Sequence, residues 1–225
     1  TTRWKYDLGD GCPTVCGWGN NELQSYTSHK DNVRIKGGKL IITARKTGQE
    51  KPQFTSTRLV SKRDWKYAYI EVRARLPKAV GTWPAIWMLP TDWKYGGWPD
   101  SGEIDIMEHV GYDPGVVHGT VHTQAFNHGI GTQKGKQIDV PTYDSEFHRY
   151  AIRWAEDKIE FFVDDQLYNT FENTGGGYKE WPFDQHFHLL LNLAVGGNWG
   201  GKEGVAEEAF PQRMEVDYVR VYALD

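Results

Sequence analysis

The stretch Ser101-Gly-Glu-Ile-Asp-Ile-Met-Glu-His109 interleaves three carboxylates with apolar side chains. Because successive side chains of a β-strand point to opposite faces, we expect Glu103 and Asp105 on one face and the isoleucines on the other, against a core. Glu108 lies five positions after Glu103, so a regular strand would turn it away from the other two carboxylates. A β-bulge between Asp105 and Glu108 would absorb one residue and return Glu108 to their side. The stretch therefore predicts a bent strand with three carboxylates on one face.

Such a row of like charge is costly unless the carboxylates are solvated, paired or used in chemistry. Two carboxylates about 5–5.5 Å apart are the machinery of a retaining glycosidase, in which one attacks the sugar and the other donates a proton. A solvated acidic strand face is the plainer interpretation. A metal site is a third, since His109, His118 and His122 follow in the sequence, but no tight ligand spacing such as H-E-x-x-H is present. We therefore expect no metal cofactor in catalysis.

Tryptophans precede the acidic stretch, at positions 83, 87 and 98, and the chain has ten in all. The flat C–H faces of sugar rings stack on aromatic side chains, so a cleft lined by Trp with acids in its floor suits carbohydrate. Packing in the core or on the surface would account for many of these tryptophans equally well. Trp87 in particular fits a buried strand position as well as a cleft position.

Several motifs together resemble the laminarinase branch of glycoside hydrolase family sixteen. They are Thr82-Trp-Pro-Ala-Ile-Trp-Met-Leu89, the isolated Trp98 and Gly102-Glu-Ile-Asp-Ile-Met-Glu-His109. The resemblance extends from Gly17-Trp-Gly-Asn-Asn-Glu-Leu-Gln24 to Val216-Asp-Tyr-Val-Arg-Val-Tyr222, which is nearly the whole chain.

The resemblance implies roles for individual residues. Glu103 is the expected nucleophile and Glu108 the expected general acid/base. Asp105 lies between them and is expected to hold a proton or hydrogen bond that sets their charge states. Positions that match cleft residues of the family are expected to bind substrate: Asn20, Glu22, Arg58, Trp83, Trp98, His122 and Trp199. A solvated or structural role remains the alternative for each polar member of this set.

The resemblance favours a retaining endo-β-1,3-glucanase acting on β-glucan polysaccharides or oligosaccharides. The two-residue spacing between Asp105 and Glu108 is similar to that of the laminarinase branch, whereas a shorter E-x-D-x-E spacing is more typical of licheninases. The alternatives are cleavage of mixed-linkage β-1,3-1,4-glucan and a non-catalytic β-glucan-binding domain on the same fold. The presence of both Glu103 and Glu108 argues against a binding domain.

Short alternating segments predict an all-β fold. Residues 69–76 alternate apolar and charged side chains, and Gly37-Gly38 is a two-residue hairpin signal. Many short strands with Gly and Pro turns predict a β-sandwich of two antiparallel sheets. Residues 4–19 and 127–136 are expected to be loops, and no segment has a helical period. The family resemblance narrows the sandwich to a jelly roll whose concave sheet carries the substrate cleft.

The length of 225 residues suffices for one domain with a sizeable core, and we interpret residues 1–225 as a single catalytic domain. Members of the family usually begin with another strand, which we expect to be absent here. The net charge of -4 and the pI near 6.1 do not indicate a basic surface for binding nucleic acid. No apolar run approaches the ~18 residues of a membrane span, so no membrane partner is expected. We expect a monomer.

Cys12 and Cys16 are the only two cysteines. They could close a small disulfide loop in a secreted protein, although two free thiols fit the sequence as well. The family resemblance implies secretion. It also implies a structural calcium ion on the convex side, bound by the carbonyl of Gly38 and by Asp217, with a further ligand from the opening strand that is expected to be absent.

Overall fold

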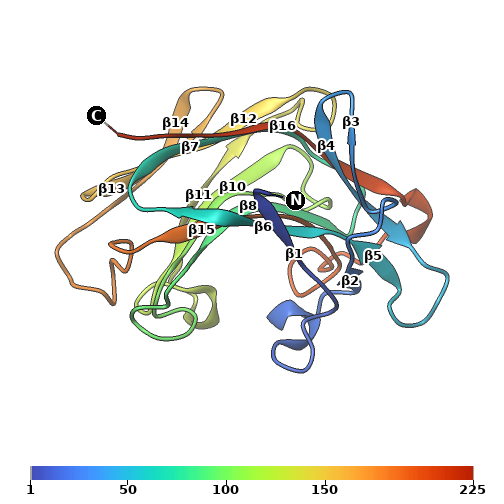
Figure 1. Ribbon diagram of the computed structural model, residues 1–225, viewed down its shortest axis with the longest axis horizontal. Helices are drawn as coiled ribbons and strands as arrows, with labels where there is room; N and C mark the ends of the chain where they lie inside the picture. Colours follow the sequence, from blue (N-terminus) through green and yellow to red (C-terminus); the bar gives the residue numbers. More distant parts are fainter. Residues whose placement is uncertain (1, 225) are drawn as a thin grey trace.

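Two β-sheets pack face to face in the computed structural model, which describes residues 2–224 (Figure 1). One sheet has seven strands, in the spatial order β1 (Trp4–Asp7), β6 (Arg58–Trp65), β15 (Phe187–Val195), β8 (Thr82–Pro90), β9 (Glu103–Glu108), β10 (Val116–His122) and β11 (Lys134–Asp139). Every pair of neighbours in this sheet is antiparallel.

The second sheet has nine strands. Their order is β14 (Gln166–Glu172), β13 (Lys158–Val163), β12 (His148–Trp154), β7 (Ala68–Arg75), β16 (Gln212–Tyr222), β4 (Lys39–Lys46), β5 (Phe54–Ser56) and β2 (Gln24–Tyr26), with β3 (Val33–Lys36) paired to β4. The β2–β5 pair is parallel and the other recorded pairs are antiparallel. The prediction of an all-β sandwich is confirmed.

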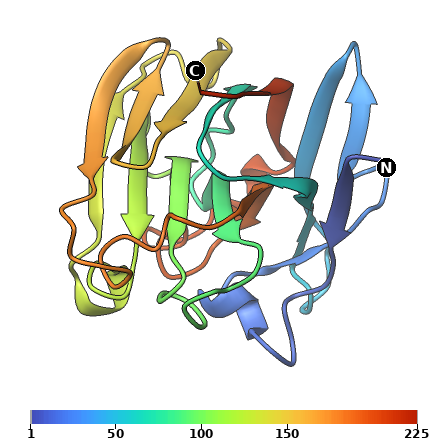
Figure 2. The same cartoon turned by 60° about the vertical axis from the view of Figure 1, so that its left-hand side comes forward.

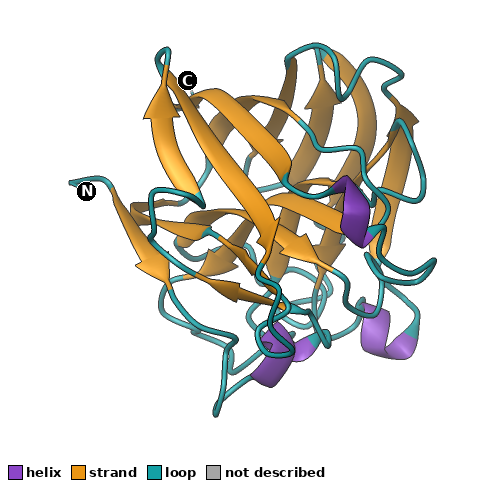
Figure 3. Ribbon diagram, turned by 90° about the vertical axis from the view of Figure 1, so that its right-hand side faces the viewer, coloured by secondary structure: helices purple, strands orange, loops and turns teal. Residues whose placement is uncertain are grey.

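The helical content is limited to short 3₁₀ turns in the connections, drawn in purple in Figure 3. They are η1 (Cys16–Gly19), η2 (His128–Ile130) and η3 (Glu207–Ala209). Within residues 2–224, no helix has the length and apolar character needed to cross a membrane. The blue loop after β1 and the green loop between β8 and β9 extend beyond the same end of the sandwich (Figure 2).

The core lies between the sheets and follows the two-residue period of the strands. On β7, Ile70, Val72 and Ala74 are fully buried, as their alternation predicts. Arg73 and Arg75 point the other way and form ion pairs with Asp217 and Glu215 on β16. The Gly37-Gly38 hairpin between β3 and β4 is confirmed, with both residues at positive φ as a two-residue turn of this kind requires.

Two segments that the sequence predicts as loops contain strands. Trp4–Asp7 forms β1, and the second half of the 127–136 segment begins β11 at Lys134. Both are edge strands of the seven-stranded sheet, so only one side of each is hydrogen-bonded to a neighbour. Short edge strands bury few side chains, and the apolar alternation that marks a strand in sequence is therefore weak.

The predicted bulge is present in β9. In the pairing with β8, Glu108 lies opposite Ala85 and Met107 opposite Ile86, but the next partner of β8, Trp87, lies opposite Asp105. The pairing with β10 shifts at the same place. One residue, Ile106, is therefore left out of the ladder, which restores Glu108 to the face of Asp105.

Gly119 on β10 lies where the two sheets approach too closely for a side chain. An added Cβ would be 2.2 Å from Tyr168 Oη and 2.8 Å from Phe161 Cδ1. Gly119→Ala should therefore lower the free energy of unfolding by about 1–3 kcal/mol, measured by urea denaturation. Gly97→Ala places its Cβ where no atom lies within 4 Å, so this control should stay within about 0.5 kcal/mol of the parent. Equal stability of the two variants would contradict the close approach.

Candidate active site

The three carboxylates of β9 share one face of the seven-stranded sheet, with the core behind them. Ile104, Ile106 and Met107 belong to the buried cluster between the sheets. Because the bulge turns both Ile106 and Met107 inward, Glu108 emerges on the open face beside the other acids. The sequence pattern E-x-D-x-x-E is thus the local signature of this bent strand.

Glu103 and Glu108 each accept a hydrogen bond from a different tryptophan. Trp83 Nε1, on the neighbouring strand β8, donates to Glu108 Oε1 at 3.0 Å. Trp98 Nε1, in the loop before β9, donates to Glu103 Oε2 at 2.6 Å. An N–H donor stabilises the charged form of the carboxylate that it contacts. Both indoles therefore support negative charge on the cleft face.

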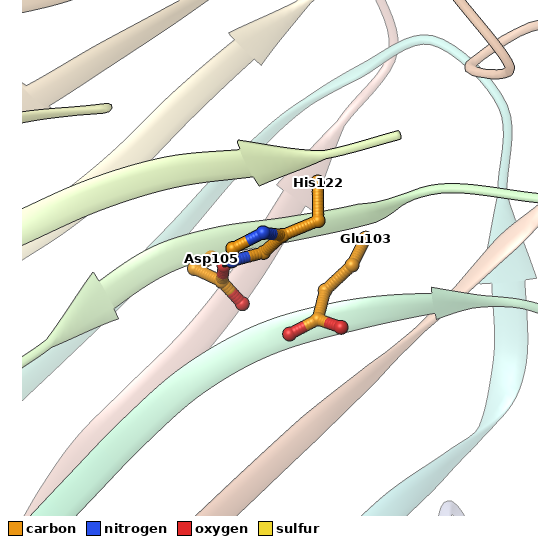
Figure 4. A group of neighbouring side chains, drawn as sticks. All are labelled: Glu103, Asp105 and His122. Atoms are coloured by element: carbon orange, nitrogen blue, oxygen red, sulfur yellow. Dashed lines mark ion pairs between the residues drawn. The ribbon is translucent and has the colours of Figure 1, made fainter. Parts of the chain in front are cut away.

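Asp105 is almost completely buried between these two acids, at 1% exposure. Figure 4 shows the ring of His122, from β10, beside its carboxylate, and His122 Nε2 lies 3.3 Å from Asp105 Oδ2. That contact lacks hydrogen-bond geometry, and neither Asp105 oxygen has a hydrogen-bond partner among the described residues. One oxygen or nitrogen each from Glu103, Asp105 and His122 all lie within 4.8 Å of one another.

Burial raises the pKa of all three carboxyls. It lifts the pKa of Glu108 to about 7, with the charge of Glu103 as the second cause. Burial, then the charge of Asp105, holds the pKa of Glu103 well above its usual range. Burial and the charge of Glu108 do the same for the pKa of Asp105. Burial and mutual repulsion therefore oppose the simultaneous ionisation of all three carboxyls.

The acids lie where two hollows of the sheet meet. We call the first the Arg58 hollow; its distinctive lining residues are Trp18, Glu22, Tyr26, Arg58, Trp87 and Asn192. We call the second the His118 hollow; its distinctive lining residues are His118, Thr120, His122, His128, Gln133, Asn198 and Trp199. Both are also lined by Asn20, Trp83, Glu103 and Glu108. A cleft therefore extends to both sides of the carboxylates, as an enzyme that cuts inside a chain needs.

Comparison with known proteins identifies the family. The sequence model described as glycosyl hydrolases family 16 matches residues 20–220. The chain belongs to this family. A beta-glucanase of Rhodothermus marinus is 55% identical over 230 residues, which cover 98% of this chain and 79% of the relative. The chain is thus a glycoside hydrolase, and the family resemblance is confirmed.

Solved structures agree in fold. The laminarinase from Rhodothermus marinus matches with a TM-score of 0.93 and 54% identity, over 98% of this chain and 90% of that one. A non-specific endo-β-1,3(4)-glucanase of family 16, co-crystallised with 1,3-β-D-cellotriosyl-glucose, matches with a TM-score of 0.91 and 43% identity, over 98% and 88%. The jelly-roll architecture predicted from the resemblance is therefore confirmed.

The cleft of this family 16 hydrolase gathers the residues that the sequence singles out. Of the expected substrate-binding set, all but Trp98 line one of the two hollows. Trp98 lies at the rim over Glu103 and is 39% exposed. Trp87, left open by the sequence, faces the cleft and donates from Nε1 to Asn192 Oδ1 at 2.7 Å. These positions agree with the expectations, while the role of each residue remains a prediction.

Other lining residues were not predicted. His118 and Thr120 could have been found, because they alternate with His122 on one face of β10. Trp18 and Asn192 carry no such signal, since loop conformation and the pairing of distant strands bring them to the cleft. Spacing in the sequence indicates which residues share a face of one strand, but it does not indicate which strands are neighbours.

The cluster of Glu103, Asp105 and His122 is compact enough to be considered as a metal site. Its surroundings suit a different use. The indole N–H of Trp98 is directed at Glu103, and that of Trp83 is directed at Glu108. Such donors stabilise carboxylates in place of a cation. Catalysis without a metal therefore stays our expectation.

The expected calcium ligands fit an ion poorly. Gly38 and Asp217 line one hollow, whose other lining residues come mainly from strands of both sheets. The Asp217 carboxylate is already paired with Arg73, with Nη1 at 2.6 Å from Oδ2. Calcium takes six to eight oxygen ligands, whereas these two residues offer one side-chain carboxylate and backbone carbonyls. The structural calcium ion remains a prediction.

The raised pKa of Glu108 makes folding stability depend on pH. The pKa of Glu108 is near 7 in the folded protein and 4.5 in the unfolded chain. As pH rises through that interval, the free energy of unfolding falls, because the carboxyl ionises less readily in the folded state. Glu108→Gln removes this ionisation. Its free energy of unfolding relative to the parent should therefore rise between pH 5 and pH 8, on the order of 1–3 kcal/mol.

Urea denaturation at both pH values measures this difference. Glu146→Gln, at an exposed carboxyl, is the control and should show no comparable change. A constant difference between Glu108→Gln and the parent from pH 5 to pH 8 would contradict the buried, raised titration of Glu108.

Proposed function

We propose that this glycoside hydrolase is a retaining endo-β-1,3-glucanase in which Glu103 is the nucleophile and Glu108 the general acid/base. The observation that carries the proposal is the arrangement on β9. Two carboxylates with separate indole donors and raised pKa values lie in the floor of a cleft that is open to both sides. The identity to the Rhodothermus marinus laminarinase supports β-1,3-glucan as the substrate.

In the first step, the ionised Glu103 attacks the anomeric carbon of the glucose above it. A bond forms between the Glu103 oxygen and that carbon while the glycosidic C–O bond breaks. Glu108 gives its proton to the departing oxygen, which leaves as the hydroxyl of the released sugar. A pKa near 7 keeps Glu108 substantially protonated at neutral pH, as this step requires.

In the second step, Glu108 acts as the base. It takes a proton from water, whose oxygen attacks the same anomeric carbon and displaces Glu103 as a carboxylate. Each displacement inverts the configuration, so the β configuration is retained. Glu108 ends the cycle protonated and Glu103 ends it ionised.

The attack requires a charged Glu103 although burial raises its pKa. We assign the proton that Glu103 and Asp105 could share to Asp105. Trp98 Nε1 donates to Glu103 Oε2 at 2.6 Å, whereas Asp105 is more deeply buried and receives no such N–H. The contact between the two carboxyls acts in the opposite direction, since it raises the pKa of Glu103 and lowers that of Asp105, and the Trp98 donor decides our assignment. A protonated Asp105 can also donate to Glu103, which stabilises the ionised nucleophile.

Mixed-linkage cleavage is the second candidate. The 43% identical structure carries the name of a non-specific endo-β-1,3(4)-glucanase, so a cleft of this form accommodates both linkages in that protein. A purely binding role is disfavoured, because one buried and two partly buried carboxyls cost stability that simple binding of a neutral sugar would not require. Comparing rates on laminarin and on lichenan separates the two linkage preferences.

We also propose a secreted protein. Cys12 and Cys16 form a disulfide, with their Cα atoms 4.2 Å apart. Disulfides persist mainly in oxidising compartments, which supports export from the cytosol. The monomeric state remains a prediction.

Glu103→Ala should abolish turnover but keep binding. Without the attacking carboxylate, no covalent intermediate forms, and activity on laminarin should fall by roughly 10³-fold or more in a reducing-sugar assay. The aromatic lining is untouched, so calorimetry should still detect β-1,3-gluco-oligosaccharides. Glu146→Ala, at an exposed position, is the control with normal rates. A Glu103→Ala variant with a tenth of the parental activity would rule out Glu103 as nucleophile.

Glu108→Ala should respond to azide. Laminarin, whose sugar leaving group needs a proton, should be almost inert, whereas an activated aryl glycoside of a β-1,3-gluco-oligosaccharide still forms the intermediate. Azide needs no general base, so it should restore turnover and give a β-glycosyl azide, identified by NMR. An α-glycosyl azide, or no response to azide, would refute the two-carboxylate assignment.

A further inference from the structure

Trp18 lines the Arg58 hollow, although no motif predicted a role for it. It lies in η1, at the end of a small loop that the Cys12–Cys16 disulfide closes. This loop follows the edge strand β1 and lies outside both sheets. The position of its indole is therefore set by the loop and not by sheet register.

The Trp18 ring contacts the guanidinium group of Arg58. Its centroid is 4.5 Å from Arg58 Cζ, and the centroid of Trp87 is 4.8 Å from the same atom. Contacts of this kind between a cation and an aromatic ring are favourable and fix the orientation of the guanidinium plane. Arg58 Nε also lies 3.1 Å from Asp7 Oδ2. Two rings and one carboxylate thus hold a side chain that is only 11% exposed.

The terminal nitrogens of Arg58 can donate to a ligand, while burial raises the pKa of nearby Glu22 and the charge of Arg58 opposes that rise. Among residues 2–224, no hydrogen bond to protein is recorded for these terminal nitrogens, and Arg58 lines the cleft. A guanidinium edge presents N–H donors in a fixed plane, and sugar hydroxyls are suitable acceptors. Glu22 lines the same hollow. Its Oε2 accepts a hydrogen bond from Gln24 Nε2 at 2.6 Å.

The backbone of Trp18 indicates that its placement is enforced. Its φ is +52°, in the left-handed region, which is unfavourable for a bulky residue. Such a conformation persists where the surroundings hold it, and it is often found at functional sites. Here the disulfide, the Val15 N–H bond to Gly11 O at 2.8 Å and the Trp18 Nε1 bond to Gly9 O at 3.3 Å supply that support.

We propose that Trp18 is a positioning residue for substrate binding, which acts through Arg58 and depends on the Cys12–Cys16 disulfide. Trp18 and Trp87 hold the guanidinium so that its terminal N–H groups meet hydroxyls of the β-glucan chain in the Arg58 hollow. The disulfide keeps Trp18 in contact with Arg58. The inference rests on the proposed function, because a β-glucan chain is the ligand.

Binding of a β-1,3-linked glucohexaose to full-length variants tests this, by calorimetry with Glu103→Ala as the non-hydrolysing parent. Trp18→Leu should raise Kd roughly 3- to 30-fold. In the presence of Arg58→Gln the same change should have less than about a 2-fold effect, because the residue through which Trp18 acts is gone. Trp93→Leu is the matched control: this Trp also has a positive φ, is exposed and lines neither hollow.

The double variant Cys12→Ser/Cys16→Ser keeps Trp18 and should raise Kd in the same direction as Trp18→Leu. It carries the test if circular dichroism shows that Trp18→Leu does not fold. An unchanged Kd in folded variants, or an equal loss with and without Arg58, would overturn the proposal. Release of reducing sugar from laminarin by the unaltered chain is measured alongside. If the unaltered chain released no reducing sugar, the proposed function would be wrong. If it cleaved laminarin normally and the variants had an unchanged Kd, only the role of Trp18 would be wrong.

Discussion

The crowding of three carboxyls on one face of β9, with Asp105 buried and Glu103 and Glu108 partly buried, is the constraint that the rest of the cleft satisfies. Like charges held out of water repel and lose hydration, so the folded protein must neutralise or stabilise them. In the mechanism that we propose, a proton on Asp105 removes a charge from the middle of the row. Indole donors stabilise the charges that remain on the outer two acids. The chemistry of a retaining glycosidase uses the same arrangement, with one acid charged and the other protonated.

The sheet supplies the rigidity that this arrangement needs. Trp83 and Glu108 lie on adjacent strands, and Asp105 and His122 lie on another adjacent pair, so hydrogen-bonded registers fix these distances. The bulge at Ile106 is the single irregularity that the arrangement requires. It bends a strand whose inward side chains remain fully buried, so the core and not the cleft opposes any slip of register.

Sequence reasoning succeeded where the information is local. The alternation on β7, the hairpin at Gly37-Gly38 and the bulge in β9 follow from the order of side chains along a few residues. The edge strand β1 was missed because a strand with one partner buries too little to show a period. The choice of a jelly roll and the residue roles came from resemblance to a family, since alternation alone does not determine how strands are ordered in a sheet.

The contacts of Arg58 mark the boundary of what a local pattern can predict. Asp7, Trp18, Trp87 and Asn192 approach it or its neighbours from four separate segments. Their association depends on strand order and on a disulfide loop, which are properties of the whole chain. The reacting groups, in contrast, all derive from one strand and its two partners. In the roles that we propose, the chemistry is supported by the sheet, and recognition of the glucan in the Arg58 hollow is supported partly by a loop. Loops tolerate changes in sequence and length better than a paired central strand does. On this proposal, changes in the η1 loop alter how the glucan is held while leaving the three carboxyls in place.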